Sequence, residues 1–383
     1  MRLGVTRRWI WLGLLLLAGC GGMAVEETAV SPILSQAVAS ANCPTVAAQQ
    51  PCDPRPQFAE YAVNNQYDQF AWDLFLFVSW PAVPNERGVA DGSQKLGKPA
   101  ATAVWQTWKN VAEVYVPAGQ TPLPWNSPIV PPLLETNMEI DGRLLTDKQG
   151  RPTLMQVNQN EATFDYIVNQ RHLYSRAGQA AFFADPAAPP IEFPAEAIEV
   201  KAIWRILDAA EQQSGRYHVT EGCYTDDSGN KQCATLGMTA LHLISKVQPH
   251  WFWATFEQVD NPQTTNAPVL QPIAPAVAKL NEAMQAQVAG TTWQYYQLRG
   301  SQWSFMLGEQ PVVLANTQIE TQFQQSSSCM TCHARSSIGA ANSRAEMWDF
   351  AHGNVQGYVG NPPPFDNGKF KPLDYVWSLR RAK

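Results

Sequence analysis

The sequence predicts an α+β fold in which an antiparallel β-sheet follows an N-terminal helical region and is surrounded by further helices. Residues 65–80 carry apolar side chains at helical spacing, and Pro81 ends the run. Residues 198–206 alternate in polarity, which is typical of a half-buried strand. Residues 251–257 are apolar on both faces, and this pattern indicates a central strand.

The remaining elements follow in chain order from the same periodicities. In the first half we expect a helix over 101–111, an irregular Pro-rich stretch over 117–136, a hairpin over 138–157 that turns at 146–150, and a helix over 161–179. In the second half we expect a strand over 238–247, an amphipathic helix over 277–288, and aromatic strands over 293–298 and 304–307. These elements predict one large domain over 56–383, with a helical part over 56–190 and a β-rich part over 191–383.

The composition excludes several classes of function. The chain has 383 residues, of which 45% are hydrophobic and 16% charged, so it can bury a substantial core. Its net charge of −6 provides no basic surface for nucleic acid or anionic lipid. The sequence contains no phosphate-binding glycine loop and no Ser-His-Asp order, which argues against a nucleotide enzyme or a hydrolase.

The N-terminus predicts export and lipidation. Residues 1–19 combine a basic start with an apolar run that is too short to span a bilayer, as in a signal peptide. The small residues before Cys20 resemble a bacterial lipobox, which predicts that Cys20 is lipidated and that residues 20–55 form a polar tether. Gly21 favours the outer membrane. Removal of three arginines with the signal lowers the net charge from −6 to −9. The alternative is an ordinary secretory signal with an incidental cysteine.

The seven cysteines are an odd number for an exported protein. One is the predicted lipid anchor. Cys43 and Cys52 lie in the tether, and Cys223 and Cys233 bracket a turn-like segment. An oxidising compartment favours a disulfide within each pair. Two cysteines then remain for a different chemistry.

The remaining two cysteines form the sequence Cys329-Met330-Thr331-Cys332-His333. Two thiols about one helical turn apart can add to the two vinyl groups of one haem, while the adjacent histidine ligates its iron. The alternatives are a zinc half-site, a redox-active pair and a third disulfide. Together with the export signal, the motif predicts one covalent haem c whose iron is bound by His333.

The residue on the other side of the iron stays open at this stage. Met347, Met306 and His352 are candidates by residue type. Each is also an ordinary core or surface residue. A vacant or water-bound position would instead permit the binding or chemistry of a small molecule.

The order of motifs resembles the β-sheet cytochromes of the cytochrome P-460 and cytochrome c′-beta family. The resemblance covers roughly residues 190–335 and rests on E-F-P-A-E-A-I-E-V-K at 192–201, L-H-L-I-S-K at 241–246, W-F-W-A-T-F at 251–256 and C-M-T-C-H-A at 329–334. The whole chain is also similar to larger bacterial cytochrome c family lipoproteins. The resemblance implies a five-coordinate haem against an antiparallel sheet, and, as in cytochrome P-460, a lysine cross-linked to the porphyrin and oxidation of hydroxylamine.

The resemblance also implies roles for individual residues. Lys201 matches the cross-linking lysine, with Lys246 as a second candidate, although the alternation of its strand predicts a solvated side chain for Lys201. Trp251 and Trp253, with Phe256, are expected to form walls of the haem pocket. His242 is predicted to be a core or surface residue of its strand rather than a second ligand.

Three functions are compatible with these features. The first is electron transfer by a lipid-anchored monohaem cytochrome between redox partner proteins of the periplasm. The second is a cytochrome P-460-like oxidoreductase acting on hydroxylamine, nitrogen oxides or peroxide. The third is a gas-binding haem protein. We rank electron transfer first because the sequence shows no catalytic residues, and we expect a five-coordinate or weakly six-coordinate iron.

Overall fold

The structure, a computed structural model, describes residues 50–97, 101–131, 133–138, 143–226, 228–345, 359–365 and 368–383. The predicted signal peptide, Cys20 and Cys43 lie outside these residues, as do Met347 and His352. Within the described ranges, no helix is long and apolar enough to cross a membrane.

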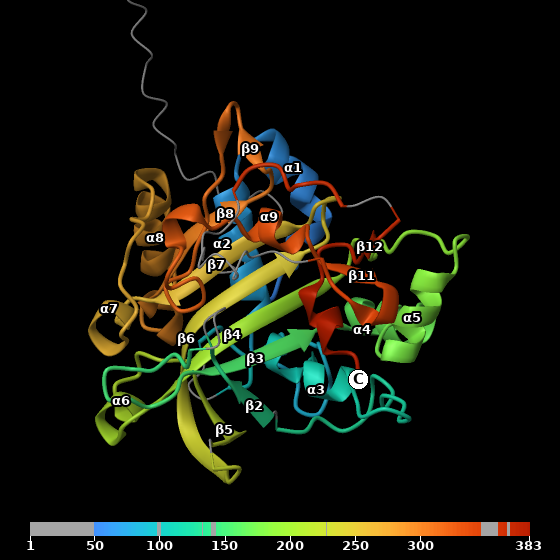
Figure 1. Cartoon of the computed structure of the whole chain (residues 1–383). Helices are drawn as coiled ribbons and strands as arrows, with labels where there is room; N and C mark the ends of the chain where they lie inside the picture. Colours follow the sequence, from blue (N-terminus) through green and yellow to red (C-terminus); the bar gives the residue numbers. More distant parts are fainter. Residues whose placement is uncertain are drawn as a thin grey trace, which may run out of the picture. The chain divides into compact units, whose positions relative to one another are not determined.

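The elements of the described residues are shown in Figure 1. The α-helices are α1 (Phe58–Val63), α2 (Tyr67–Val78), α3 (Val111–Val114), α4 (Glu161–Asp165), α5 (Arg176–Ala184), α6 (Ala209–Gln213), α7 (Asn261–Thr264), α8 (Pro275–Gln287) and α9 (Cys329–His333). The strands are β1 (Lys109–Asn110), β2 (Leu133–Thr136), β3 (Leu154–Gln159), β4 (Ile198–Ile206), β5 (Val219–Thr225), β6 (Lys231–Ser245), β7 (Phe252–Gln258), β8 (Tyr296–Gln302), β9 (Met306–Leu307), β10 (Gln310–Pro311), β11 (Ser337–Gly339) and β12 (Phe370–Pro372). Short 3-10 helices include η2 (Val104–Thr107), η4 (Thr292–Tyr295) and η8 (Trp377–Arg381), and η3 (Tyr166–Gln170) is a π-helix.

Eight strands form one sheet, and five of them close on themselves. The path runs β1-β3-β2-β5-β6-β7-β8, and β4 pairs with both β3 and β6. Strands β2, β3, β4, β6 and β5 therefore make a closed barrel, from which β7 and β8 extend along the outer edge of β6. Every pairing in this sheet is antiparallel except the short parallel contact of β2 with β5. The predicted α+β class with a largely antiparallel sheet is thus confirmed.

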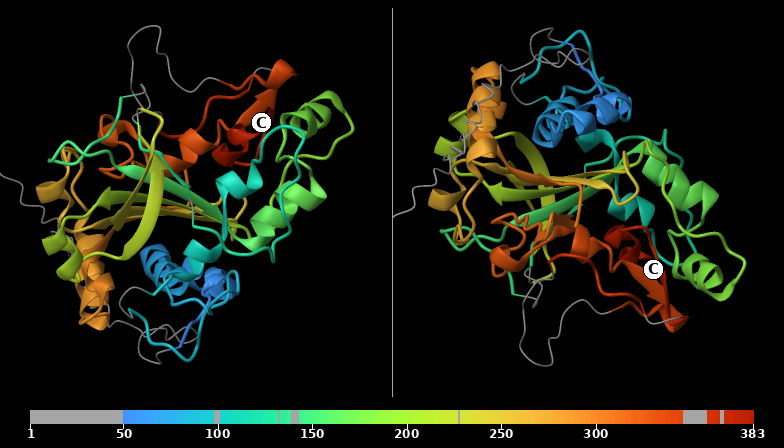
Figure 2. Two further views of the ribbon diagram at one scale, coloured as in Figure 1. Left: turned by 90° about the horizontal axis from the view of Figure 1, so that it is seen from below. Right: turned by 90° about the horizontal axis from the view of Figure 1, so that it is seen from above.

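The sheet separates two layers, as Figure 2 shows. Helices α1 and α2 lie on one face, where Phe75 of α2 stacks on Phe256 of β7 with ring centroids 4.2 Å apart, and Phe70 meets Phe252 edge to face. Helix α9 and the C-terminal residues lie on the other face. Successive side chains of a strand point to opposite faces, so β7 supplies both layers.

Several predicted elements are confirmed. The helix expected over 65–80 is α2, and the strand expected over 198–206 is β4. The pair Cys223 and Cys233 is disulfide-bonded across β5 and β6. Cys52 is disulfide-bonded as well, while its predicted partner lies outside the described residues.

Two predicted helices are wrong. Residues 101–111 form η2, β1 and the start of α3, because the side chain of Asn110 accepts a hydrogen bond from the Ala112 N–H and caps a new helix there. Residues 161–179 are divided between α4 with η3 and a separate α5, whose N-cap is Ser175. Strands β1 to β3 come from the part of the chain that was expected to be mostly helical.

Two strand predictions need correction. Strand β4 is not half-buried, since Glu199 and Arg205 on its polar face are as buried as the apolar residues between them. The layer that contains α9 covers this face of β4, and a cavity lies between the two. Residues 293–298 begin as the 3-10 helix η4, and the strand β8 starts only at Tyr296.

The buried carboxyl of Asp73 in α2 gives a test of the packing between α2 and its neighbours. The carboxyl accepts hydrogen bonds from the Tyr61 hydroxyl at 2.7 Å and from Gln69 at 3.1 Å, but burial outweighs both and raises its pKa from 3.8 to about 6. The folded protein therefore holds this proton more tightly than the unfolded chain does, and stability is lost as the pH rises from about 4 to 6.

We expect Asp73→Asn to remove this loss. The unfolding free energy of the variant minus that of the wild type should grow by up to roughly 3 kcal/mol between pH 4 and pH 6 and stay constant above it. Urea denaturation at half-unit steps of pH measures this difference. A difference that does not change with pH would show that Asp73 is not buried as described.

Candidate functional site

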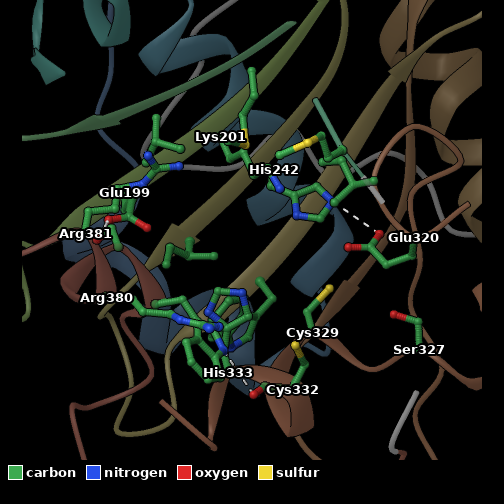
Figure 3. Close-up of a pocket in the computed structure, with 18 of the residues that line it drawn as sticks. Glu199, Lys201, His242, Glu320, Ser327, Cys329, Cys332, His333, Arg380 and Arg381 are labelled. Carbon is green, nitrogen blue, oxygen red and sulfur yellow. Dashed lines mark hydrogen bonds and ion pairs between the residues drawn. The ribbon is translucent and has the colours of Figure 1, made fainter. Parts of the chain in front are cut away.

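A cavity of about 710 Å³ lies between one face of the sheet and the layer that carries α9 (Figure 3). Its lining comes from strands β3, β4, β6 and β7, from α9, from the segment 319–327, and from the C-terminal η8. Cavities that hold cofactor-sized ligands have volumes of roughly 300–1,000 Å³. The space is therefore large enough for a cofactor.

The floor of the cavity is one face of the central strands. Lys201 of β4 lies directly opposite His242 of β6, and Glu199 lies opposite Ile244. Ile244 in turn pairs with Trp253 of β7. These five residues form the cavity floor, because residues in register across a sheet project to the same face.

Helix α9 presents the Cys-X-X-Cys-His motif to this cavity. Ser328 caps the helix by accepting a hydrogen bond from the Thr331 N–H. Gln302 of β8 fixes the start of the helix, since its Nε2 donates to Ser328 Oγ at 2.8 Å and its Oε1 accepts from the Met330 N–H at 3.0 Å. Cys329 and Cys332 are free thiols, and both line the cavity with His333.

The imidazole of His333 has a defined tautomer. Its Nδ1 lies 2.8 Å from the carbonyl oxygen of Tyr375, and a carbonyl can only accept, so Nδ1 carries the proton. Burial lowers the pKa of His333 to about 4, which keeps the ring neutral. The ring packs on Trp253, with centroids 4.5 Å apart. Nε2 therefore keeps its lone pair and is available as a ligand.

The C-terminal segment, residues 374–381, holds the carbonyl of Tyr375 in place. Lys246 Nζ donates to Asp374 Oδ1 at 2.7 Å, and Asp374 Oδ2 accepts from the Phe193 N–H at 2.8 Å. Asp374 and Tyr375 both have positive φ, so the chain turns sharply at this point. Further along, Trp377 Nε1 donates to the carbonyl of Cys332 at 3.2 Å and ties the segment to α9.

The two ends of the cavity carry different polar groups. The thiols of Cys329 and Cys332 lie on one side in Figure 3, and Arg380 and Arg381 lie on the other. Arg344 also lines the cavity, and its Nη1 is buried with no hydrogen-bond partner among the described residues. Burial, together with the positive charges of Arg380 and Arg176, lowers the pKa of Arg344 to about 10. This end of the cavity can therefore bind an anion.

Two titratable side chains of the floor, Lys201 and His242, have Glu320 of the segment 319–327 as a neighbour. Burial lowers the pKa of Lys201, while the carboxylate of Glu320 acts in the opposite direction. Burial also lowers the pKa of His242, and the positive charge of Lys201 acts in the same direction. His242 Nε2 lies 3.7 Å from Glu320 Oε2, too far for a hydrogen bond, and this buried atom has no hydrogen-bond partner among the described residues.

The structure places some of the predicted site residues in the cavity. Cys329, Cys332 and His333 meet there as expected, and Trp253 and Lys201 also line it. The expectation that Lys201 is solvated is wrong, because the second layer covers its face of β4.

Other predicted site residues lie elsewhere. Trp251 does not line the cavity: its φ of +59° interrupts the alternation, and its ring packs on Phe193. Phe256 lies on the opposite face of the sheet, against α2. Lys246 forms an ion pair with Asp374, and Met306 lies in β9 outside the cavity lining.

The sequence assigned no cavity role to Glu320 or the three arginines, and it favoured a core or surface position over a ligand role for His242, which lines the cavity. The position of His242 could have been inferred from the strand register, since it shares the face of Trp253 when β6 and β7 are paired. Nothing in the local sequence around Glu320 or Arg344 indicates a site, because only the folded chain brings them to the cavity.

Comparisons with known proteins add no relative. No protein-family model matches the chain, and no significant match to a curated protein or to a solved structure was found. Among the described residues, no group of three or more His, Cys, Asp or Glu side chains is arranged to hold a metal ion by itself.

The pair Lys246 and Asp374 provides a test of how the C-terminal segment is anchored. Both side chains are more than nine-tenths buried, at 6% and 7% exposure. Lys246→Ala leaves the Asp374 carboxylate buried without its cation, so we expect a loss of about 3–5 kcal/mol in unfolding free energy. The matched control is Arg216→Ala, which breaks the partly exposed pair with Asp260 and should cost about 1 kcal/mol or less.

Denaturant unfolding of both variants measures the two losses, and limited proteolysis of Lys246→Ala should show new cleavage in 374–381. Equal losses in the two variants, with no new cleavage, would contradict the anchoring role.

Proposed function

We propose that the cavity holds one haem c, bound through thioether bonds to Cys329 and Cys332 and ligated by His333. The main support for this proposal is the arrangement of side chains on α9. Two free thiols one turn apart and a neutral imidazole with a defined Nε2 lone pair all line one cavity. A hydrogen bond from the second ring nitrogen to a carbonyl is the usual support of a metal-ligating histidine.

The distribution of polar groups in the cavity fits a haem. The vinyl groups of haem and its two propionates lie on opposite edges of the macrocycle. The thiols lie at one end of the cavity and Arg380 and Arg381 at the other, so the vinyl edge would meet Cys329 and Cys332 while the carboxylates meet these arginines. Arg344 also lines the cavity and feels the charge of Arg380, and its Nη1, which has no partner among the described residues, would then gain an anionic one.

The alternatives to haem have less support from the site. A zinc site needs two further ligands near the thiols, and no such group exists in the part of the chain that the structure describes. A third disulfide would leave the ordered Nε2 of His333 and the cavity beside it without a role.

We infer that the protein is a lipid-anchored cytochrome on the periplasmic side of a bacterial outer membrane and that its function is electron transfer. When bound, the haem supplies a one-electron redox centre. The residues of this chain orient the ligand: Tyr375 fixes the His333 ring, and Trp253 packs against it. An acidic body suits docking to basic redox partners.

Attachment of the haem can be tested with the full chain, produced in a bacterial host that matures c-type cytochromes. The intact mass of the mature wild-type protein should exceed its polypeptide mass by one haem. The double variant Cys329→Ser/Cys332→Ser should lose this addition completely. The matched control Cys223→Ser/Cys233→Ser should keep it, because that disulfide lies outside the cavity lining. A wild-type protein without haem, or a double variant that retains it, would refute the proposal.

The position of Lys201 favours a second candidate function. Lys201 lies in the cavity, in the segment that resembles the cross-linking region of cytochrome P-460. A covalent bond between this lysine and the porphyrin would favour an oxidoreductase acting on hydroxylamine or another small nitrogen or oxygen compound. Electron transfer requires no such bond.

Peptide mapping separates the two candidates. If the protein is an electron carrier, the peptide that contains Lys201 should be unmodified in the mature haem protein, and Lys201→Arg should keep the wild-type absorption spectrum. A Lys201 peptide joined to haem, which disappears in Lys201→Arg, would favour the oxidoreductase.

A further inference from the structure

The ligand on the second side of the iron can be sought among the residues that line the cavity. Of the candidates named from the sequence, Met306 lies in β9 outside the cavity lining, and Met347 and His352 lie outside the described residues. The cavity itself is lined by one further imidazole, that of His242. The other described histidines, His172, His218 and His250, do not line it.

His242 and His333 enter the cavity from different sides. His242 projects from β6 on the sheet, whereas His333 projects from α9, and Figure 3 shows the two imidazoles on opposite sides of the cavity. The His333 ring packs on Trp253, which pairs with Ile244, and His242 lies two residues before Ile244 on β6. Two residues of a strand span roughly 7 Å along its direction. The two rings are thus displaced from one another along the sheet, and both border the same cavity.

The Nε2 atom of His242 is in an unusual state for a buried polar atom. It is buried and has no hydrogen-bond partner within the described part of the chain. The carboxylate of Glu320 lies near it, with Oε2 3.7 Å away, and this oxygen already accepts a hydrogen bond from the Asn316 N–H at 2.7 Å. An unsatisfied buried nitrogen of this kind destabilises the folded protein, and ligation to a metal would satisfy it.

The other donors of the lining are less suited to the position. Met155 pairs with Ile203, two residues beyond Lys201 on β4, and therefore lies farther from α9 than His242 does. Met138 is 57% exposed. Lys201 lies beside His242 but would have to lose a proton before it could act as a ligand, whereas imidazole ligates as the neutral ring.

We propose that the imidazole of His242 would ligate the haem iron in addition to that of His333. This inference rests on the proposed attachment of haem to α9. It replaces the five-coordinate iron implied by the resemblance to cytochrome P-460. With two ligands supplied by the chain, the iron would have no vacant position for a gas or a substrate, which favours electron transfer.

The test uses the full mature protein and begins with the wild type. Its ferric form should be low-spin by electron paramagnetic resonance, with the near-infrared magnetic circular dichroism band of two imidazole ligands. The ferrous form should not bind carbon monoxide on mixing. His242→Ala and His242→Gln should both become high-spin and bind carbon monoxide, and added imidazole should return His242→Ala to the low-spin state.

The control is His250→Ala. Because His250 is exposed and does not line the cavity, this substitution should leave every spectrum unchanged. The intact mass of each variant separates the two proposals. A wild-type protein without haem refutes the proposed function, and with it this inference. If the wild-type protein carries haem but is high-spin, the ligand assignment alone is refuted. The same holds if both His242 variants carry haem and remain low-spin.

Discussion

The hydrogen bond from His333 Nδ1 to the carbonyl of Tyr375 determines which nitrogen of the imidazole is free. Because the acceptor is a backbone carbonyl, its position depends on the path of the chain. That path is fixed by the buried pair of Lys246 with Asp374 and by two consecutive residues with positive φ. The C-terminal segment therefore acts on the site through the backbone, although Tyr375 is more than forty positions away from the motif in the chain.

The two faces of the sheet have different roles. The face toward α2 is closed by aromatic contacts such as the stack of Phe75 on Phe256, and it stabilises the domain. The face toward α9 carries Glu199, Lys201 and His242, which are polar and largely buried. Burying such groups is unfavourable unless they find partners. The carboxyl of Glu199 accepts hydrogen bonds from Gln159 and Ser378, whereas Nε2 of His242 has no hydrogen-bond partner among the described residues. We therefore assign Glu199 a supporting role and propose His242 as a ligand.

The sequence was most informative where a single element carries its own pattern. Helix α2, strand β4 and the disulfide between β5 and β6 follow from local periodicity or spacing, and the motif at α9 follows from covalent chemistry. Prediction failed where a backbone turn or a second layer decides the outcome. Asn110 caps a new helix inside an apparently continuous one, and the positive φ of Trp251 turns its ring away from the cavity. The burial of Lys201 depends on residues more than a hundred positions later, so its strand alone could not reveal it.

In the proposed protein, one haem is bound covalently through both thiols of α9. The pyridine haemochrome spectrum of the purified mature chain, taken after the protein is unfolded in alkali, tests this attachment because it reports how many vinyl groups are saturated. We expect one haem per chain, with the band position of a haem that has lost both vinyl groups. A spectrum with intact vinyl groups, or the absence of haem, would show that the thiols do not hold a haem in this way.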